Sequence, residues 1–412
     1  MEIRMEEKKR RCLYLILCVL ALIAALFPVG SSTVMSGGII LEGIARIEEI
    51  ALGFHKGQVY LFPSAGALTS TGIMTNAMNS NLWLLFPGLI YRLSENIVLA
   101  YRIYMILIQV GTLLAAMMFF QRIFEKAETR IPACFGILLY MTCPYRIYVC
   151  YDWANLSQAA AWMLLPLYAW AVAGIIRKRN FRDLLVAALA LAGIGYADAV
   201  FFVILTVLTL LVVLIVRKPW IIVTVATGGV LFLPGVYRLA RYLFLGDFAD
   251  WNIPLQSIMK NGYHFGQYFQ SYVYREGHPG MGLGMLISLL TGLWLIFVKG
   301  IKNSKEYKAG SLFTGLSVFL TLLSFYCFPW DILQRLGGWS LKLISLMETP
   351  AVFWGLALAG MCIPAACAVD QISKDENKVI TFAVPVMVVL ACIGICVYQC
   401  NMLTDSRVPL NF

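Results

Sequence analysis

The stretch PYRIYVCYDWANLSQ, residues 144–158, lies between two apolar segments that are each long enough to cross a bilayer. The chain of 412 residues is 60% hydrophobic and 13% charged, and its mean hydropathy of +0.79 exceeds that of soluble domains. We therefore expect most of the chain to lie in lipid as helices, which satisfy their own backbone hydrogen bonds there. The polar side chains of residues 144–158 then mark one surface of the membrane.

The apolar segments predict an all-α polytopic membrane protein with about 11 transmembrane helices in a single integral membrane domain, residues 1–412. The first span runs from Cys12 to about Met35, after the basic start MEIRMEEKKRR, and we expect it to remain as an uncleaved anchor. The other spans are expected near residues 97–120, 131–149, 156–176, 183–197, 199–216, 219–237, 281–298, 310–328, 351–369 and 379–398.

The net charge of +10 is concentrated in the short connections between predicted spans, which argues against a nucleic-acid partner. The basic residues of these connections are Lys8 to Arg11, Arg122, Lys126, Arg130, Arg177 to Arg179, Arg182, Arg217, Lys218, Lys299, Lys302, Lys305, Lys308, Lys374 and Lys378. All of them fall on one side if the spans alternate from a cytoplasmic N-terminus, as the positive-inside rule expects. We expect residues 1–11 in the cytoplasm and the C-terminus outside.

The outer face is then expected to carry the first outer loop (36–96), residues 150–155, the second outer loop (238–280), the third outer loop (329–350) and the C-terminal tail. The segment NLWLLFPGLIYRL, residues 81–93, is too short for an easy span and contains Pro87. Counting it as a span would move every later basic connection outside. We expect a re-entrant or interfacial helix there.

Residues 39–54 of the first outer loop predict an amphipathic helix that lies along the membrane surface. Its apolar face carries Ile40, Ile44, Ile47, Ala51 and Phe54, and its other face carries Glu42, Arg46 and Glu49. One interpretation is a solvated face with an intrahelical Glu42–Arg46 pair. The other makes Glu42 or Glu49 a general base at the boundary between water and lipid.

Further polar residues of the outer face have two interpretations each. The second outer loop is aromatic and basic, including Arg238 and Arg241, and is typical of an aromatic belt or of a site for a lipid-linked phosphate that carries a sugar. Asp198 is a functional candidate within an apolar region or a residue of an interfacial turn. Asp152 and Gln158 lie where they either cap a helix or bind a ligand.

We expect no metal site and no soluble cofactor. The chain has 11 cysteines but no Cys-x-x-Cys knuckle, and its three histidines are scattered. Most of the cysteines lie in predicted spans, where a thiol behaves as a small hydrophobic group. There is no P-loop, and the glycines of GMGLG follow no strand.

Three segments carry a common pattern. Residues 101–175 contain a basic connection, the turn CPYR and a helix with LPL, residues 324–358 contain FPW, and residues 46–60 read RIEEIALGFHKGQVY. Together these segments resemble the bacterial YfhO-like membrane proteins, often labelled 6-pyruvoyl-tetrahydropterin-synthase-related. The resemblance implies a fold and activity of the GT-C-type glycosyltransferase superfamily in a bacterial cell membrane. Such enzymes take a sugar from a polyprenyl-phosphate donor, and an acid of the first large outer loop serves as the base.

The chain departs from that family at charged positions of the outer face. Relatives usually place an Asp and a His before the Arg46-Ile47 pair, an Arg and a Glu after the Pro-Tyr-Arg turn, a His after the next two helices and an Arg after a later proline. The matching residues here are Ile39, Gly43, Trp153, Gln158, Asp198 and Val352, with Glu348 just before the last. Longer relatives carry a further extracytoplasmic domain, so acceptor handling is expected to differ.

The leading functional hypothesis is a GT-C-like glycosyltransferase that moves a sugar from a polyprenyl-phosphate donor to an envelope or lipid-linked acceptor. The candidate catalytic residues are Glu42, Glu49, Asp152 and Asp198, and the candidate substrate-binding residues are Arg46, Arg146, Tyr151, Gln158, Arg238, Arg241 and Glu348. The alternative is a non-catalytic partner in the synthesis of cell-envelope polymers, which the replaced family residues favour. A transporter or lipid flippase ranks third, because the chain contains no convincing internal repeat.

Overall fold

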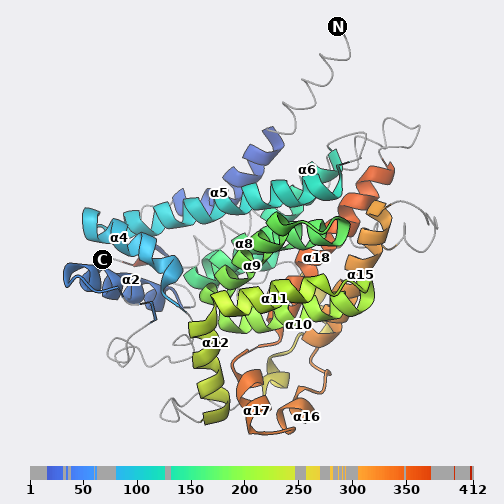
Figure 1. Cartoon of the computed structure of the whole chain (residues 1–412). Coiled ribbons are helices and arrows are strands. Elements are labelled where there is room, and N and C mark those ends of the chain that lie inside the picture. Colours follow the sequence, from blue (N-terminus) through green and yellow to red (C-terminus); the bar gives the residue numbers. More distant parts are fainter. Residues whose placement is uncertain are drawn as a thin grey trace.

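In a computed structural model, almost every described element is a helix (Figure 1). The structure describes residues 16–30, 34–35, 39–59, 61–62, 80–125, 131–245, 257–269, 279–281, 286, 290, 293, 305–347, 349–372, 394 and 409–410. The strands β1 (Val34–Met35) and β2 (Pro409–Leu410) form a single short antiparallel pairing, in which Val34 lies opposite Leu410. The all-α expectation is therefore confirmed for the described part of the chain.

The helices fall into long bundle helices and short outer ones. After an N-terminal helix over Ile16–Gly30, the bundle helices are α5 (Ile97–Ile123), α6 (Ile131–Met141), α7 (Pro144–Ile147), η4 (Tyr148–Asp152), α8 (Leu156–Arg177), α9 (Phe181–Ala197), α10 (Ala199–Val216), α11 (Trp220–Leu231), α15 (Lys305–Ser324) and α18 (Ala351–Ile372). The short helices are α2 (Ile40–His55), η3 (Leu82–Leu84), α4 (Leu85–Ser94), α12 (Leu233–Ala240), η5 (Arg241–Leu245), η6 (Ile258–Asn261), α13 (Phe265–Phe269), α16 (Trp330–Gln334) and α17 (Gly338–Ser345).

Five described helical segments are long and apolar enough to cross a membrane, or six if the bent pair α11–α12 forms one span. They are Ile97–Ile123, Pro132–Asp152, Leu156–Arg177, Ala199–Val216 and Ala351–Asp370. Shorter apolar helices cover Ile16–Gly30, Leu82–Ser94 and Ala309–Ser324. A multi-pass membrane protein is thus supported, whereas the count of about 11 stays a prediction, since the expected spans 281–298 and 379–398 lie almost entirely outside the described residues.

Side-chain caps fix where several bundle helices begin. Asn96, Asn155 and Asn180 accept hydrogen bonds from backbone N–H groups in the first turns of α5, α8 and α9. Asp198 does the same for α10, with two backbone donors. A short polar side chain at this position satisfies N–H groups that no preceding turn can bind. The sequence positions of these residues therefore set the connections between the helices.

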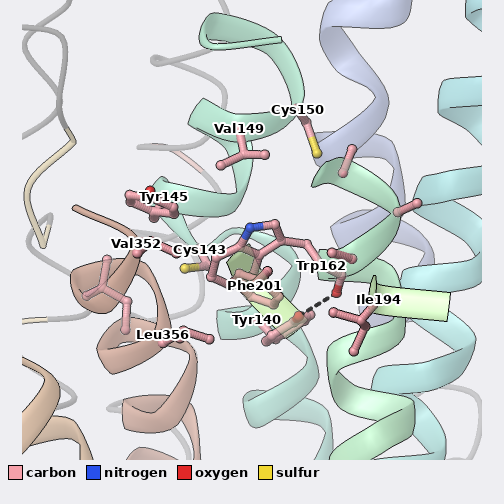
Figure 2. Packing of buried hydrophobic residues seen from close by; sticks show 14 of the residues in the cluster. Tyr140, Cys143, Tyr145, Val149, Cys150, Trp162, Ile194, Phe201, Val352 and Leu356 are labelled. Atoms are coloured by element: carbon pink, nitrogen blue, oxygen red, sulfur yellow. Dashed lines mark hydrogen bonds between the residues drawn. The ribbon is translucent and has the colours of Figure 1, made fainter. Parts of the chain in front are cut away.

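The core forms where α6, α8, α9, α10 and α18 meet (Figure 2). Trp162 of α8 is fully buried, with its ring centroid 5.7 Å from that of Phe201 and 5.6 Å from that of Tyr145. The hydroxyl of Tyr140 on α6 donates a hydrogen bond of 2.7 Å to the carbonyl oxygen of Trp162. Val352 of α18 completes this contact region (Figure 2). Large side chains from helices far apart in the sequence thus hold the bundle together.

The helix connections alternate between two ends of the bundle. At one end, Arg122 lies 3.2 Å from Asp183, and the guanidinium of Arg179 lies 3.1 Å from the ring centroid of Trp220. At the other end, α2 and α4 pack together beside the start of α5 (Figure 1). The basic connections after α5, α8 and α10 therefore share one end, as expected. Which end faces the cytoplasm stays a prediction.

Two expected segments differ in detail from the described structure. The outer segment 150–155 is shorter than expected, because Tyr148–Asp152 forms the buried π-helix η4 and only residues 153–155 connect it to α8. The expected span 219–237 is broken after Leu231, and α12 leaves α11 at an angle of 81°. Pro234 lies in the first turn of α12, where its missing N–H costs no helical bond, but it cannot continue the hydrogen bonds of α11.

The segment 81–93 forms η3 and α4, a helical unit over Leu82–Ser94 that is shorter than a span. It is therefore not one of the five long apolar segments, and its re-entrant or interfacial position stays a prediction. The third outer loop, 329–350, contains α16 and α17 rather than irregular chain alone. Both regions place short helices at the ends of bundle helices.

Candidate functional site

The polar face of α2 is turned into the protein. Glu42 and Arg46 are each only 4% exposed, and Glu49 is half-buried. The neighbouring Glu48 is exposed, and so is Leu41. The interpretation of Glu42, Arg46 and Glu49 as a solvated face is therefore wrong. We call these three residues the α2 polar stripe.

Close packing of α2 against two other helices explains this burial. A Cβ atom added to Gly88 of α4 would lie 2.5 Å from Cγ2 of Ile50, and one added to Gly43 would lie 2.9 Å from Cδ1 of Leu156. The absence of a side chain at both glycines lets α4 and α8 approach α2 on two sides. The backbone N–H of Ile39 also donates a hydrogen bond of 2.9 Å to the carbonyl oxygen of Trp153.

Arg46 is the centre of the hydrogen bonds around the stripe. Its Nε donates to Oδ1 of Asn81 at 2.9 Å, its Nη1 to Oγ of Ser157 at 3.3 Å and its Nη2 to the carbonyl oxygen of Ser80 at 2.8 Å. Burial lowers the pKa of the guanidinium, while the carboxylates of Glu42 and Glu49 raise it. A buried cation thus lies between two acids and three neutral partners.

The first turn of α8 links this stripe to Asp198. Arg46 binds Ser157, and the next residue, Gln158, hydrogen-bonds the side chain of Asp198. Oδ1 of Asp198 also accepts from the N–H groups of Val200 and Phe201, at 2.9 and 3.0 Å. Burial raises the pKa of Asp198, and these three hydrogen bonds lower it, with burial the larger effect. The stripe and Asp198 therefore lie on either side of one helix start.

Asp152 ends the π-helix η4, close in sequence to this helix start, and is buried. Asn155 caps α8 by accepting from the N–H of Gln158 at 3.0 Å. Of the four candidate catalytic residues, Glu42 and Glu49 are thus brought together around Arg46, while Asp152 and Asp198 flank the neighbouring turn. Their participation in chemistry stays a prediction.

Arg146 and Tyr151 form a separate cluster in the core. Arg146 is fully buried, and its guanidinium donates to the carbonyl oxygens of Tyr140, at 3.2 Å, and Met141 and to Oε1 of Gln109, at 2.5 Å. The side-chain amide of Gln109 donates to the hydroxyl of Tyr151 at 3.0 Å. The structure therefore joins these two candidate substrate-binding residues to each other, through Gln109, and their guanidinium and hydroxyl groups bind protein carbonyls and an amide.

The remaining arginines of the prediction lie on the bent helix. The guanidinium of Arg238 lies 4.4 Å from the ring centroid of Phe62, and that of Arg241 lies 5.7 Å from that of Tyr237. Burial lowers the pKa of Arg238, which is half-buried. Glu348 lies outside the described residues.

The partners of the stripe were not foreseen in the sequence. Asn81, Ser80 and Ser157 are small polar residues far from Arg46 along the chain, so no local spacing indicates their contact. The hydroxyl of Tyr104 donates to the carbonyl oxygen of Leu156 at 2.9 Å, beside the same helix start. A polar residue directly before an apolar helix is the only sequence signal for such a partner, and it also fits an ordinary cap.

Within the described residues, no three His, Cys, Asp or Glu side chains converge in a way that could hold a metal ion. The chemistry available at the α2 polar stripe is therefore that of two carboxylates, one guanidinium and amide or hydroxyl groups. Compared with known proteins, the chain matches no family model and no curated protein.

Proposed function

We propose that this protein is a membrane glycosyltransferase of the GT-C type, which transfers a sugar from a polyprenyl-phosphate donor at the end of the bundle that carries α2. The observation that supports it best is the burial of Glu42 and Arg46, with Glu49 half-buried beside them, where Arg46 contacts α8. A stripe on an ordinary surface helix would face water. Buried acids beside a cation are unusual and commonly functional.

The proposed roles follow from the charge of each group. Transfer of a sugar to a hydroxyl acceptor needs a base that takes the acceptor proton, and Glu42 or Glu49 supplies a carboxylate for it. The departing polyprenyl phosphate carries negative charge, which a guanidinium such as that of Arg46 stabilises. Asp198, Asp152 and Gln158, at the adjacent helix start, would contact sugar hydroxyls.

A second function is favoured by a specific observation. All three nitrogens of the Arg46 guanidinium already donate to Asn81, Ser157 and Ser80, and Asp198 already caps α10. Side chains that are fixed by hydrogen bonds to the protein suit a site that binds a lipid-linked sugar without turning it over. The alternative is therefore a non-catalytic binding partner in envelope-polymer synthesis.

The test uses the purified full chain in lipid nanodiscs with radiolabelled undecaprenyl-phosphate glucose, galactose, mannose or N-acetylglucosamine. We expect the wild type to release sugar from at least one donor and the E42Q/E49Q double variant to be slower by about 100-fold or more. The control is E48Q, which removes an exposed carboxylate from the same helix and should leave the rate unchanged.

The outcomes separate the two functions. Full activity of the double variant would remove Glu42 and Glu49 from the mechanism. Saturable donor binding by the wild type without release of sugar would favour the non-catalytic function. Absence of both binding and release for all four donors would contradict both proposals.

A further inference from the structure

The bent pair α11–α12 places a short helix nearly perpendicular to a bundle helix. The two helices meet at 81°, and α11 packs along α9 within the bundle. Because α11 packs along α9, α12 runs nearly at right angles to that part of the bundle. Figure 1 shows α12 leaving the bundle in this way, and its extension η5 contacts α17.

The outward faces of these short helices are apolar. Phe244 and Leu336 are each 68% exposed, and the full set of exposed apolar residues is Leu233, Tyr237, Phe244, Ile332, Leu336 and Trp339. We call these six residues the interface patch. The inward faces are also apolar, with Leu239, Tyr242 and Ile344 buried. A helix between protein and water would instead carry polar residues on its outer face.

The charges on the same helices are mostly positive. Arg238, Arg241, Arg335 and Lys342 are opposed by a single acid, Asp331, which accepts a hydrogen bond of 2.5 Å from Ser257. The amine of Lys342 donates to the carbonyl oxygen of Tyr242 at 3.1 Å, which ties α17 to η5. Arg335 is exposed beside Leu336. Aromatic side chains with neighbouring cations are typical of helices that lie in the headgroup region of a bilayer.

We propose that the interface patch docks into a lipid leaflet and that the neighbouring cations, Arg241 and Arg335 among them, select anionic phospholipid headgroups. Three features favour lipid as the occupant: the patch begins at the bend where α11 ends, its exposed residues are aliphatic and aromatic, and the positive charges beside it complement a phosphate. The patch anchors α12, η5, α16 and α17 flat at the membrane surface. This property is independent of any sugar chemistry at α2.

The test measures the depth of a fluorescent label in nanodiscs. A bimane label is placed at W339C or F244C in a background that has Ser in place of Cys12, Cys327, Cys367, Cys392, Cys396 and Cys400, since the other five native cysteines are buried. Control labels are placed at L214C, on a residue that is 72% exposed on the span α10, and at K178C, on an exposed residue between α8 and α9. The quenchers are brominated phosphatidylglycerol, brominated phosphatidylcholine and aqueous iodide.

We expect the labels at 339 and 244 to be quenched by brominated lipid to within about twofold of the label at 214, and by iodide at least about threefold less than the label at 178. Brominated phosphatidylglycerol should quench them more than brominated phosphatidylcholine at the same mole fraction. The added R241Q/R335Q changes should make the two lipids equal.

Three results would overturn the proposal. Iodide quenching at 339 as strong as that at 178, without quenching by lipid, would place the patch in water. Protection from both quenchers would show that protein covers it, either a second copy or another partner. Equal quenching by the two lipids before the arginine changes would remove the selection for anionic headgroups.

Discussion

Arg146 brings a positive charge into the core because a proline precedes it. Pro144 has no N–H to donate to the carbonyl oxygen of Tyr140, and the helix breaks at this point between α6 and α7. The Arg146 side chain folds back and donates to the carbonyl oxygens of Tyr140 and Met141, of which that of Tyr140 also accepts from the N–H of Cys143 at 3.3 Å. The arginine two residues after the proline thus supplies donors at the helix break that Pro144 causes. This accounts for Arg146, one of the polar residues of the 144–158 stretch, without a ligand.

Replacing Arg146 with Met should therefore destabilise the protein. The carbonyl oxygen of Met141 and Oε1 of Gln109 would lose their charged donor, and that of Tyr140 would keep only the N–H of Cys143, which we expect to cost about 2–5 kcal/mol in the free energy of unfolding. Thermal unfolding in detergent micelles measures the loss. The matched control is R335M, at an exposed arginine. Equal melting temperatures of R146M and the wild type would contradict this role.

Asp198 should make the stability depend on pH. Burial raises the pKa of its carboxyl in the folded state above the unfolded value of about 3.9, so the folded protein holds this proton more tightly. The resulting stabilisation is complete at pH values below the unfolded pKa and is lost as the pH rises through the raised pKa of the folded state. D198N keeps a good helix cap and removes the titration.

Melting temperatures of both proteins between pH 4 and 8 check this prediction. The wild type should lose stability relative to D198N as the pH rises through this interval. A difference that stays constant across the interval would contradict it. D198A serves as a control for the cap, since it should be less stable than D198N by about 1 kcal/mol at every pH.

At the scale of elements, the position of α2 depends on its contact with α4. A Cβ atom at Gly88 would lie 2.5 Å from Cγ2 of Ile50, so a side chain at this position would push the two helices apart. G88A should destabilise the protein by about 1–3 kcal/mol. The control is G315A, because a Cβ atom at Gly315 meets nothing within 4 Å.

A double-mutant cycle ties this loss to the α2–α4 contact. I50A removes Cγ2, so the cost of G88A in the I50A background should be smaller by about 1 kcal/mol. Thermal unfolding of the four proteins gives the coupling. Additive effects would show that Gly88 acts elsewhere. G88A should also lower sugar release, if the proposed function holds, because the α2 polar stripe would shift.

The hydropathy pattern and the capping residues predicted much of the secondary structure. The expected spans 97–120, 156–176, 199–216 and 351–369 match α5, α8, α10 and α18 closely, because each is a long apolar run bounded by polar residues. The break of α11 was missed although Pro234 lay within the expected span. Mean hydropathy does not depend on the direction of a helix axis, so a bent helix pair and a straight span give the same hydropathy profile.

The candidate site was only partly predictable. The spacing of Glu42, Arg46 and Glu49 foretold a common helical face. Whether that face met water or protein depended on Gly43, Gly88, Asn81 and Ser157, whose contacts join residues distant in sequence. Local patterns cannot report such contacts. For the same reason Arg146 was expected near a phosphate, while the structure places it in the core.

At the scale of the whole molecule, charge divides the bundle into two ends. The described basic connections, with Arg122, Arg177 and Arg217, lie at one end, and the α2 polar stripe, Asp198 and the short helix α4 lie at the other. The proposed chemistry requires the stripe to be on the outer side of the membrane, where the positive-inside rule puts it. The proposed function therefore depends on this orientation of the bundle.

Labelling of single cysteines with a membrane-impermeant maleimide tests this claim most directly. The background carries Ser in place of Cys12, Cys327, Cys367, Cys392, Cys396 and Cys400, and its five remaining native cysteines are buried. In this background, Q58C reports on the exposed residues after α2, and K178C on the exposed connection after α8. We predict that intact cells expressing the protein label Q58C, and that K178C reacts only after the membrane is permeabilised. Labelling of K178C in intact cells, with Q58C protected until permeabilisation, would contradict the account.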